Sequence, residues 1–337
     1  MRSVVTLNGL ALSLALSSPS GSFAQAGDAS SDVAPAQLIQ SMEAAFGVHP
    51  GQRRNHTKGT CASGEFIGTP AAAQLSRSPL FTGKSIPVVA RFSIGGGDPD
   101  VADTARTVRG MALEFRVPGG ALHHMTMINT PMFVAARPAD FNALLIAAKP
   151  DPKTGTPDPK TFGSFLASHP AAMVQIDFVA HHNPPRDYYS STYFAIHTFR
   201  FIDAGAKEHL VRWRFAPQAG EVLMSDAELK SAPHDFLELG LLERTQQRPV
   251  RWDMIVSVGE PNDPQVDPTV LWPDARPHFT AGTLTISQAS PQHGAPCEKI
   301  NFDPLVMADG IAPTSDPILL FRSPAYAVSF ARRLSGQ

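Results

Sequence analysis

Short apolar runs that partly alternate with polar residues fill the region from about residue 86 to 135. The clearest are Ile86–Ser93, Arg109–Phe115 and Ala121–Met127, with glycine- and proline-rich segments between them. A period of two broken by such turns is typical of an antiparallel sheet. Similar runs recur later in the chain, at 193–201, 209–215, 249–258 and 278–286. We therefore predict that the strands form a β-barrel.

Other segments space their apolar residues at helical intervals of three and four. They are 36–46, 138–148, 161–169 and, near the end, 325–334. The segment 151–160, with its repeated Asp-Pro-Lys, is predicted to be a loop. No internal repeat or break in composition divides the chain. We predict one domain over residues 27–337, of the α+β class.

The first 26 residues have the pattern of an export signal. Arg2 gives a minimal positive region, Leu10–Leu16 is apolar, and Ala24-Gln25-Ala26 fits a small-x-small cleavage site. The apolar run is far shorter than the ~20 residues that a membrane span needs. We expect cleavage after Ala26 and, most simply, delivery to a bacterial periplasm without a membrane span.

Charge and cysteine content exclude several classes of protein. The 337 residues carry 28 Lys and Arg against 30 Asp and Glu, a net charge of −2. Nucleic-acid binding driven by bulk positive charge is therefore not expected. Two cysteines, Cys61 and Cys297, are too few for a disulfide scaffold or a cysteine-based zinc module. They form either one long-range disulfide or two separate buried thiols.

Two local groups of residues suggest chemistry. In Arg53–Gly59 a histidine, His56, lies among basic residues, which suits an anion site or a general base. Near the other end, Arg322 and Tyr326 are four residues apart, so one helical face brings the guanidinium against the phenol. A positive charge there favours the phenolate, a hard oxygen ligand suited to ferric iron. From spacing alone, a solvated loop at Arg53–Gly59 and an ordinary hydrogen bond between Arg322 and Tyr326 are the simpler interpretations.

Taken together, these segments resemble the haem catalase family, and more closely its small exported branch, the catalase-related peroxidases. The resemblance runs from about Gln52 to Arg333. The matching segments, in order, are Arg53–Gly59, Ala90–Ser93, Arg109–Ala112, Asn129–Phe133, His197–Arg200, Asn301–Pro304, Gly310–Asp316 and Arg322–Tyr326. The fold implied is an antiparallel eight-stranded β-barrel with surrounding helices and a buried haem b.

The resemblance implies roles for the residues on the distal side of that haem. His56 would be the base that moves a proton between the two peroxide oxygens. Asn129 would hydrogen-bond the peroxide, and Ser93 would orient the His56 ring. Phe133 and Phe141 match distal aromatic residues, and Phe141 would flank the porphyrin. Plain core packing remains the alternative for Phe133.

It also implies roles on the proximal side. Tyr326 would be the axial phenolate ligand of the iron. Arg322 would keep that phenolate ionised, and Asp316 would belong to the same network. The positions that would hold the two haem propionates are Arg53, Arg91 and Arg333.

Several positions depart from the family pattern. Asn55 and Gly95 replace bulkier apolar residues, which predicts a wider and more polar approach to the site. Thr107 replaces the aspartate of the main channel. The histidine that supports the proximal arginine in larger catalases is predicted to be replaced by Arg214.

These features favour a haem peroxidase that reduces hydrogen peroxide or organic hydroperoxides with small electron donors. The alternatives are a true catalase that disproportionates hydrogen peroxide and a non-catalytic haem-binding protein. The sequence ends at Gln337, soon after Tyr326, without the long C-terminal extension of larger catalases. We accordingly expect no NADPH site and a monomer or homodimer.

Overall fold

The computed structural model describes residues 33–337. The predicted signal peptide, residues 1–26, and most of the predicted linker after it lie outside the described residues. The described residues form one compact unit.

An antiparallel sheet closes on itself to form the barrel. Its order is β7-β5-β4-β3-β2-β1-β9-β8, and a pairing between β8 and β7 completes the ring. Two further strands, β6 and β10, extend the sheet from β7. The strands are β1 (Gly59–Gly68), β2 (Ser85–Ile94), β3 (Arg109–Arg116), β4 (Leu122–Ile128), β5 (Tyr193–Phe194), β6 (Phe199–Ile202), β7 (Glu208–Pro217), β8 (Val250–Val258), β9 (His278–Pro291) and β10 (Ile311–Pro313). The predicted eight-stranded barrel is confirmed.

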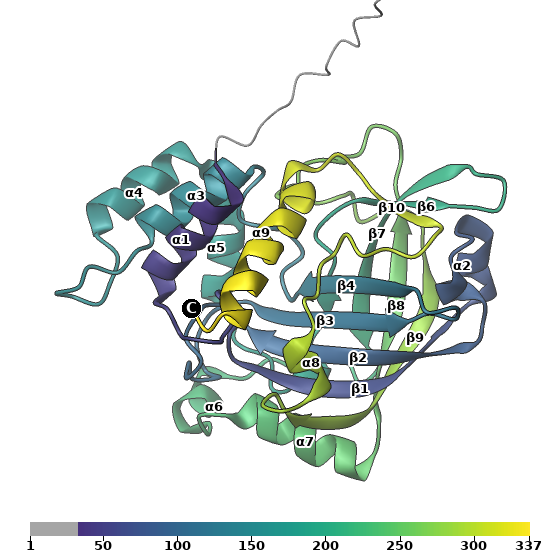
Figure 1. Ribbon diagram of the computed structural model, residues 1–337, viewed down its shortest axis with the longest axis horizontal. Helices are drawn as coiled ribbons and strands as arrows, with labels where there is room; N and C mark the ends of the chain where they lie inside the picture. Colours follow the sequence, from purple (N-terminus) through teal and green to yellow (C-terminus); the bar gives the residue numbers. More distant parts are fainter. Residues whose placement is uncertain (1–32) are drawn as a thin grey trace, which may run out of the picture. The chain divides into compact units, whose positions relative to one another are not determined.

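Helices surround the barrel. They are α1 (Pro35–Phe46), α2 (Pro70–Leu75), α3 (Pro138–Ala147), α4 (Pro159–Ser168), α5 (Pro170–His181), α6 (Asp226–Ser231), α7 (Phe236–Gln247), α8 (Pro296–Lys299) and α9 (Pro317–Leu334), with short 3-10 turns at Pro79–Phe81 and Tyr188–Ser190. In Figure 1, α3, α4 and α5 gather on one side of the barrel, and α9 (yellow) runs beside α1 (purple). The chain's two ends thus supply neighbouring helices.

Alternation along the strands decides what faces the inside of the barrel. On β2 and β3 every second residue enters the main core, namely Val88, Ala90, Phe92, Met111, Leu113 and Phe115. The residues between them, including Arg91, Ser93, Gly110 and Ala112, therefore face outward. Because large buried side chains such as Phe66, Phe215 and Trp252 fill the barrel, a ligand must bind outside it.

The elements differ from the predicted ones where local signals were weak. The strands at 193–201 are interrupted, so that β5 and β6 are separate. Helix α9 begins at Pro317 rather than Ala325, because Pro324 lies inside the helix instead of ending it. Strand β1 was not predicted, and its Gly- and Ser-rich sequence carries little strand signal. Helices α5 and α7 were also missed.

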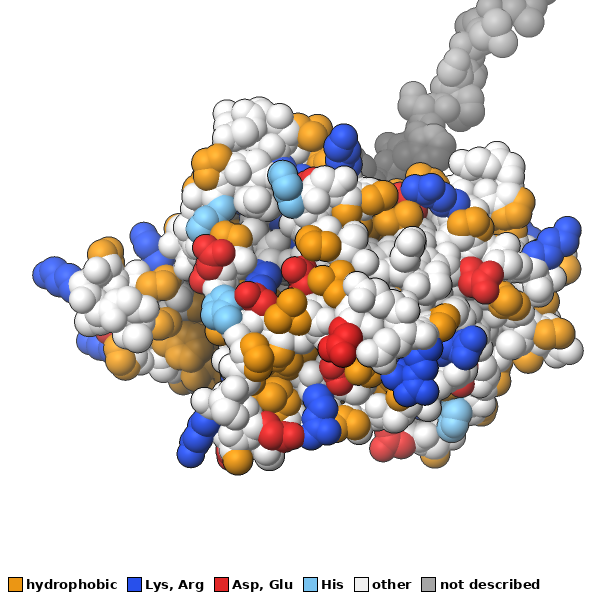
Figure 2. All heavy atoms as spheres, turned by 90° about the horizontal axis from the view of Figure 1, so that it is seen from below, with side chains coloured by type: hydrophobic (Ala, Val, Ile, Leu, Met, Phe, Trp, Pro, Cys, Tyr) orange, Lys and Arg blue, Asp and Glu red, His pale blue; other side chains and the backbone are white. Residues whose placement is uncertain are grey.

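The surface carries mixed charges. On the face shown in Figure 2, acidic and basic side chains are interspersed and hydrophobic ones are scattered among them. Within residues 33–337, no helix has the length and apolar character required to cross a membrane.

The cysteine alternatives are decided by the structure: Cys61 of β1 and Cys297 of α8 form a disulfide, with their Cα atoms 5.6 Å apart. Both are buried and pack with Val89 and Phe302. The bridge joins residues 236 positions apart. It therefore ties α8 to the barrel wall.

Replacing both cysteines by alanine is expected to lower the free energy of unfolding by about 2–5 kcal/mol, because the unfolded chain loses a long-range constraint. Urea unfolding measures this. The wild-type protein kept reduced with dithiothreitol should match the double variant. An unchanged unfolding midpoint in the double variant would contradict the prediction.

Candidate active site

A cavity of about 240 Å³ lies against the outer face of the barrel. Strands β2, β3 and β4 form its floor, and residues of α1, α3 and α9 form the other walls. Eight of the sequence-predicted site residues line it: Arg53, His56, Arg91, Ser93, Phe141, Arg322, Tyr326 and Arg333. Residues from both ends of the chain therefore meet in one cavity.

The floor consists of two cross-strand rows of residues. One row contains Ser93, Gly110 and Ile128, and the next contains Arg91, Ala112 and Thr126. Successive residues on one face of a strand are two positions apart, so the rows are separated by about 7 Å.

His56 lies over the first row. Its Nδ1 is 3.0 Å from Ser93 Oγ. A Cβ on Gly110 would come within 3.0 Å of His56 Nδ1 and 2.7 Å of Ser93 Oγ, so glycine makes room for this pair. Among the described residues, His56 Nε2 has no hydrogen-bond partner. Burial and the positive charges of Arg91, Arg322 and Arg109 lower the pKa of His56 to about 3, which keeps the ring neutral.

Tyr326 approaches the second row from α9. Arg322, Tyr326, Ser329 and Arg333 all line the cavity, since their spacing of four, three and four residues puts them on one helical face. Arg322 donates from Nη2 and Nε to Tyr326 Oη, at 2.7 and 3.2 Å. Its Nη2 also donates to Thr126 Oγ1 of β4, at 2.6 Å. Two N–H groups of one charged guanidinium therefore converge on the Tyr326 oxygen.

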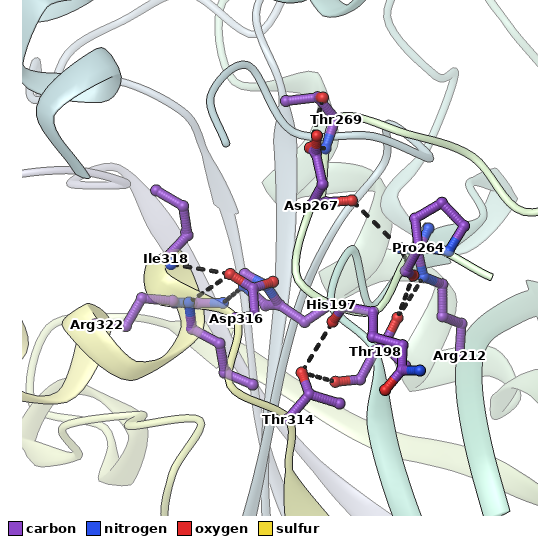
Figure 3. Close-up of polar contacts among 12 residues, drawn as sticks. His197, Thr198, Arg212, Pro264, Asp267, Thr269, Thr314, Asp316, Ile318 and Arg322 are labelled. Atoms are coloured by element: carbon purple, nitrogen blue, oxygen red, sulfur yellow. Dashed lines mark hydrogen bonds and ion pairs between the residues drawn. The ribbon is translucent and has the colours of Figure 1, made fainter. Parts of the chain in front are cut away.

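His197 and Asp316 hold the other side of Arg322 (Figure 3). Arg322 Nη1 donates to His197 Nε2 at 3.1 Å, and His197 Nδ1 is 2.7 Å from Asp316 Oδ2. Because arginine only donates, Nε2 accepts and Nδ1 carries the proton that goes to the carboxylate. Asp316 also caps α9, since its Oδ1 accepts from the Ile318 amide at 2.9 Å. Burial and Arg322 lower the pKa of His197, although Asp316 opposes this shift.

The backbone next to His197 is fixed as well (Figure 3). Arg212 Nε donates to Thr198 Oγ1 at 3.0 Å and its Nη2 to the Pro264 carbonyl at 3.1 Å. Thr314 Oγ1 donates to the Thr198 carbonyl at 2.9 Å. Because Thr198 is held through both its side chain and its carbonyl, the backbone next to His197 has little freedom to move.

The prediction that Arg214 replaces the supporting histidine was wrong. His197 occupies that place, while Arg214 lies on β7, opposite Phe194 and Ile255. The sequence reading missed this role because His197 was assigned only to a strand motif. His197 lies in the segment between β5 and β6. Its side chain is therefore not bound to the alternation of a strand and can reach Arg322.

Three guanidinium groups, Arg53, Arg91 and Arg333, gather in the same lining. Burial, Arg91 and Arg333 together hold the pKa of Arg53 well below its usual range. Arg53 Nη2 donates to the carbonyls of Cys297, Glu298 and Ile300, at 3.0, 3.2 and 2.9 Å. Arg91 is buried and Arg53 and Arg333 are partly buried, and these mutually repelling positive charges form a site that a bound anion stabilises.

Arg91 has a second task that the sequence did not reveal. Its Nη2 donates to the carbonyls of His56 and Thr57, at 2.7 and 3.0 Å, and its Nε to Gln292 Oε1 at 2.6 Å. A Cβ on Gly59 would lie 2.4 Å from Arg91 Nη2, so a glycine is required beside it. Gln292 carried no sequence signal at all.

Asn129 does not line this cavity. It lies on a smaller neighbouring one with Arg106, Thr107, Thr130 and His182. Its Oδ1 accepts from the Arg109 amide at 2.7 Å. Arg109 directly precedes Gly110, the residue over which the His56 ring lies. No acidic side chain lines the smaller cavity in the part of the chain described.

The predicted widening is not found at Gly95. A Cβ on Gly95 would lie 2.5 Å from Val108 Cγ2 and 3.1 Å from Thr107 Oγ1, so these side chains already fill that space. Asn55 lines the cavity, but its oxygen accepts from the amides of His56 and Gly96. The Asn55 side-chain oxygen is therefore used by the backbone.

Phe133 and Phe141 both line the cavity, with ring centroids 5.3 Å apart. Phe133 thus belongs to the cavity wall as well as to the packing of α3.

Comparison with known proteins agrees with this arrangement. The profile of the Catalase family matches residues 33–337. A "Catalase-related peroxidase" of Synechococcus elongatus is 48% identical over 327 residues, covering 97% of this chain and 96% of that protein. One of Mycolicibacterium paratuberculosis is 34% identical and covers 90% and 96%.

Solved catalases share the fold. A bacterial catalase superposes with a TM-score of 0.77 at 25% identity, and catalase A from Saccharomyces cerevisiae with 0.78 at 24%. Each covers 85% of this chain, which spans 58% and 62% of their lengths. By profile, sequence and fold, the chain belongs to the catalase family.

Proposed function

We propose that this protein is a haem peroxidase that reduces hydrogen peroxide or organic hydroperoxides while oxidising small donors. One observation carries the proposal: a neutral imidazole with an available nitrogen and an arginine-paired phenol oxygen line the same cavity from opposite ends of the chain. Relatives named as catalase-related peroxidases support the choice of activity.

The residues present fit a haem b. Gly110 and Ala112 leave the floor without bulky side chains, and a Cβ at Gly110 would displace His56. Arg53, Arg91 and Arg333 would hold the two propionates. Tyr326 would be the protein ligand of the iron, since it alone of the four tyrosines lines the cavity among residues 33–337. When bound, haem supplies a redox-active iron for cleavage of the peroxide bond.

His197 is unsuited to be that ligand, although it also lines the cavity. Both of its ring nitrogens are occupied, one by Arg322 and one by Asp316. Its task is to fix Arg322, which in turn fixes Tyr326.

His56 performs the proton transfer in this proposal. Its neutral Nε2 accepts a proton from one oxygen of the hydroperoxide and returns it to the departing oxygen. Ser93 keeps the ring in place through Nδ1. Because the pKa of His56 is about 3, the ring is ready to accept a proton at any pH well above that value.

The experiment compares two reactions of the haem-loaded protein. Oxygen evolution from hydrogen peroxide alone is measured against oxidation of a phenolic dye with tert-butyl hydroperoxide. We expect dye oxidation to dominate. Dominant oxygen evolution would instead identify a true catalase, and haem binding without either reaction would identify a haem-binding protein.

We also propose that residues 1–26 direct export to the periplasm, where the processed chain begins at Gly27. The buried Cys61–Cys297 disulfide supports an oxidising compartment. Amino-terminal sequencing of the processed protein tests this, and a chain still starting at Met1 would contradict it.

A further inference from the structure

His56 has an unusual backbone conformation. Its φ is 52°, in the left-handed region that side chains other than glycine rarely adopt. Such a residue persists only where its surroundings impose the conformation. The turn at His56 must therefore be held by specific contacts.

Asn55 supplies two of those contacts with one atom. Its Oδ1 accepts hydrogen bonds from the amides of His56 and Gly96, each at 2.8 Å. Gly96 follows β2 and has a φ of 113°, and its carbonyl accepts from the Thr57 amide at 3.1 Å. The segment before β1 and the turn after β2 are thus joined through the Asn55 side chain.

The opposite side of the turn is held independently. Arg91 donates to the His56 carbonyl, and Ser93 bonds the ring at Nδ1. The His56 amide, carbonyl and ring therefore each have a partner, and the amide depends on Asn55. Removing the Asn55 acceptor leaves two inward-facing amides without their partner while the ring contact remains.

We propose that Asn55 is a positioning residue for His56: its side-chain oxygen imposes the left-handed turn that directs His56 Nε2 into the cavity. Asn55 acts through the histidine and needs no contact with the peroxide. This inference rests on the proposed function only for its kinetic consequence, because the backbone contacts are independent of activity.

Two substitutions of Asn55 distinguish the effect of losing the hydrogen-bond acceptor from the effect of changing the size of the side chain. Asn55→Leu keeps a similar size but has no acceptor. Asn55→Asp keeps the acceptor and adds a negative charge next to His56. Asn183→Leu is the control, because the Asn183 side chain also bonds the backbone, donating to the Met224 carbonyl, and does not line the cavity that His56 lines.

The first measurement is hydrogen–deuterium exchange in the protein without haem. We expect Asn55→Leu to lose protection at the His56 and Gly96 amides, while Asn55→Asp and Asn183→Leu keep it. Since no turnover is involved, this result stands whatever reaction the protein catalyses. Wild-type protection in Asn55→Leu would overturn the proposal.

The second measurement is the pH profile of the haem-loaded variants. A misplaced His56 is expected to lower kcat of Asn55→Leu by about 10- to 100-fold with little change in KM. Asn55→Asp should retain most of kcat, with its acid limb at higher pH because a nearby carboxylate favours the protonated imidazole. If Asn55→Leu does not fold, Asn55→Asp decides: an acid limb at the wild-type position, or the loss of kcat, overturns the proposal.

Discussion

Replacing Tyr326 by phenylalanine is expected to abolish peroxide turnover. The substitution removes the one oxygen that Arg322 holds in the cavity through two donors. It also removes the ligand that we assign to the iron, and it leaves Nε of the partly buried Arg322 guanidinium without its acceptor. Activity and the phenolate charge-transfer absorption of the haem-loaded protein should be lost together.

Tyr193→Phe is the control for this change. Tyr193 is fully buried, its hydroxyl donates to the Tyr188 carbonyl at 3.0 Å, and it is not part of the cavity lining. The control loses one hydrogen bond but should keep the spectrum and the activity. A Tyr326→Phe protein with the wild-type spectrum would exclude Tyr326 as the ligand.

Replacing His56 by alanine is expected to lower kcat/KM for peroxide by about 10²- to 10⁴-fold, the usual contribution of a general acid–base group. Haem binding should persist, because Tyr326 and the three arginines are untouched. Steady-state kinetics and a haem titration measure the two quantities separately. His293→Ala, at a fully exposed histidine, controls for loss of an imidazole elsewhere.

The His56 imidazole also determines how kcat/KM for peroxide changes at low pH. The pKa of His56 is about 3, so the imidazole is protonated only below that value and stays neutral above it. We therefore expect no loss of kcat/KM from His56 protonation between pH 8 and about pH 4. A limb near pH 6.5 would mean that His56 titrates as an exposed histidine does. Full turnover by His56→Ala would exclude His56 as the group that transfers the proton.

Local pattern was sufficient for much of the fold. Alternation along β2 and β3 predicted the strands, since the period of two is a property of the extended chain. Strand β1, rich in small residues, could not be predicted because pairing with β2 and β9 stabilises it.

The candidate site was likewise predictable from the sequence only in part. Spacing alone paired Arg322 with Tyr326, because residues four apart share a helical face. The support from His197, and the filling of the space at Gly95 by Val108, depend on contacts between segments distant in sequence.

The sequence by itself determined the strand alternation, the Arg–Tyr pair and the set of residues that resembles the catalase family. Only the tertiary structure decided that Cys61 binds Cys297, that Asn55 serves the backbone of His56, and that Asn129 lies beside the main cavity. The reason is physical. Periodicity and helical spacing are set by neighbours along the chain, whereas the partner of a polar group is set by what the closed barrel brings within hydrogen-bond distance.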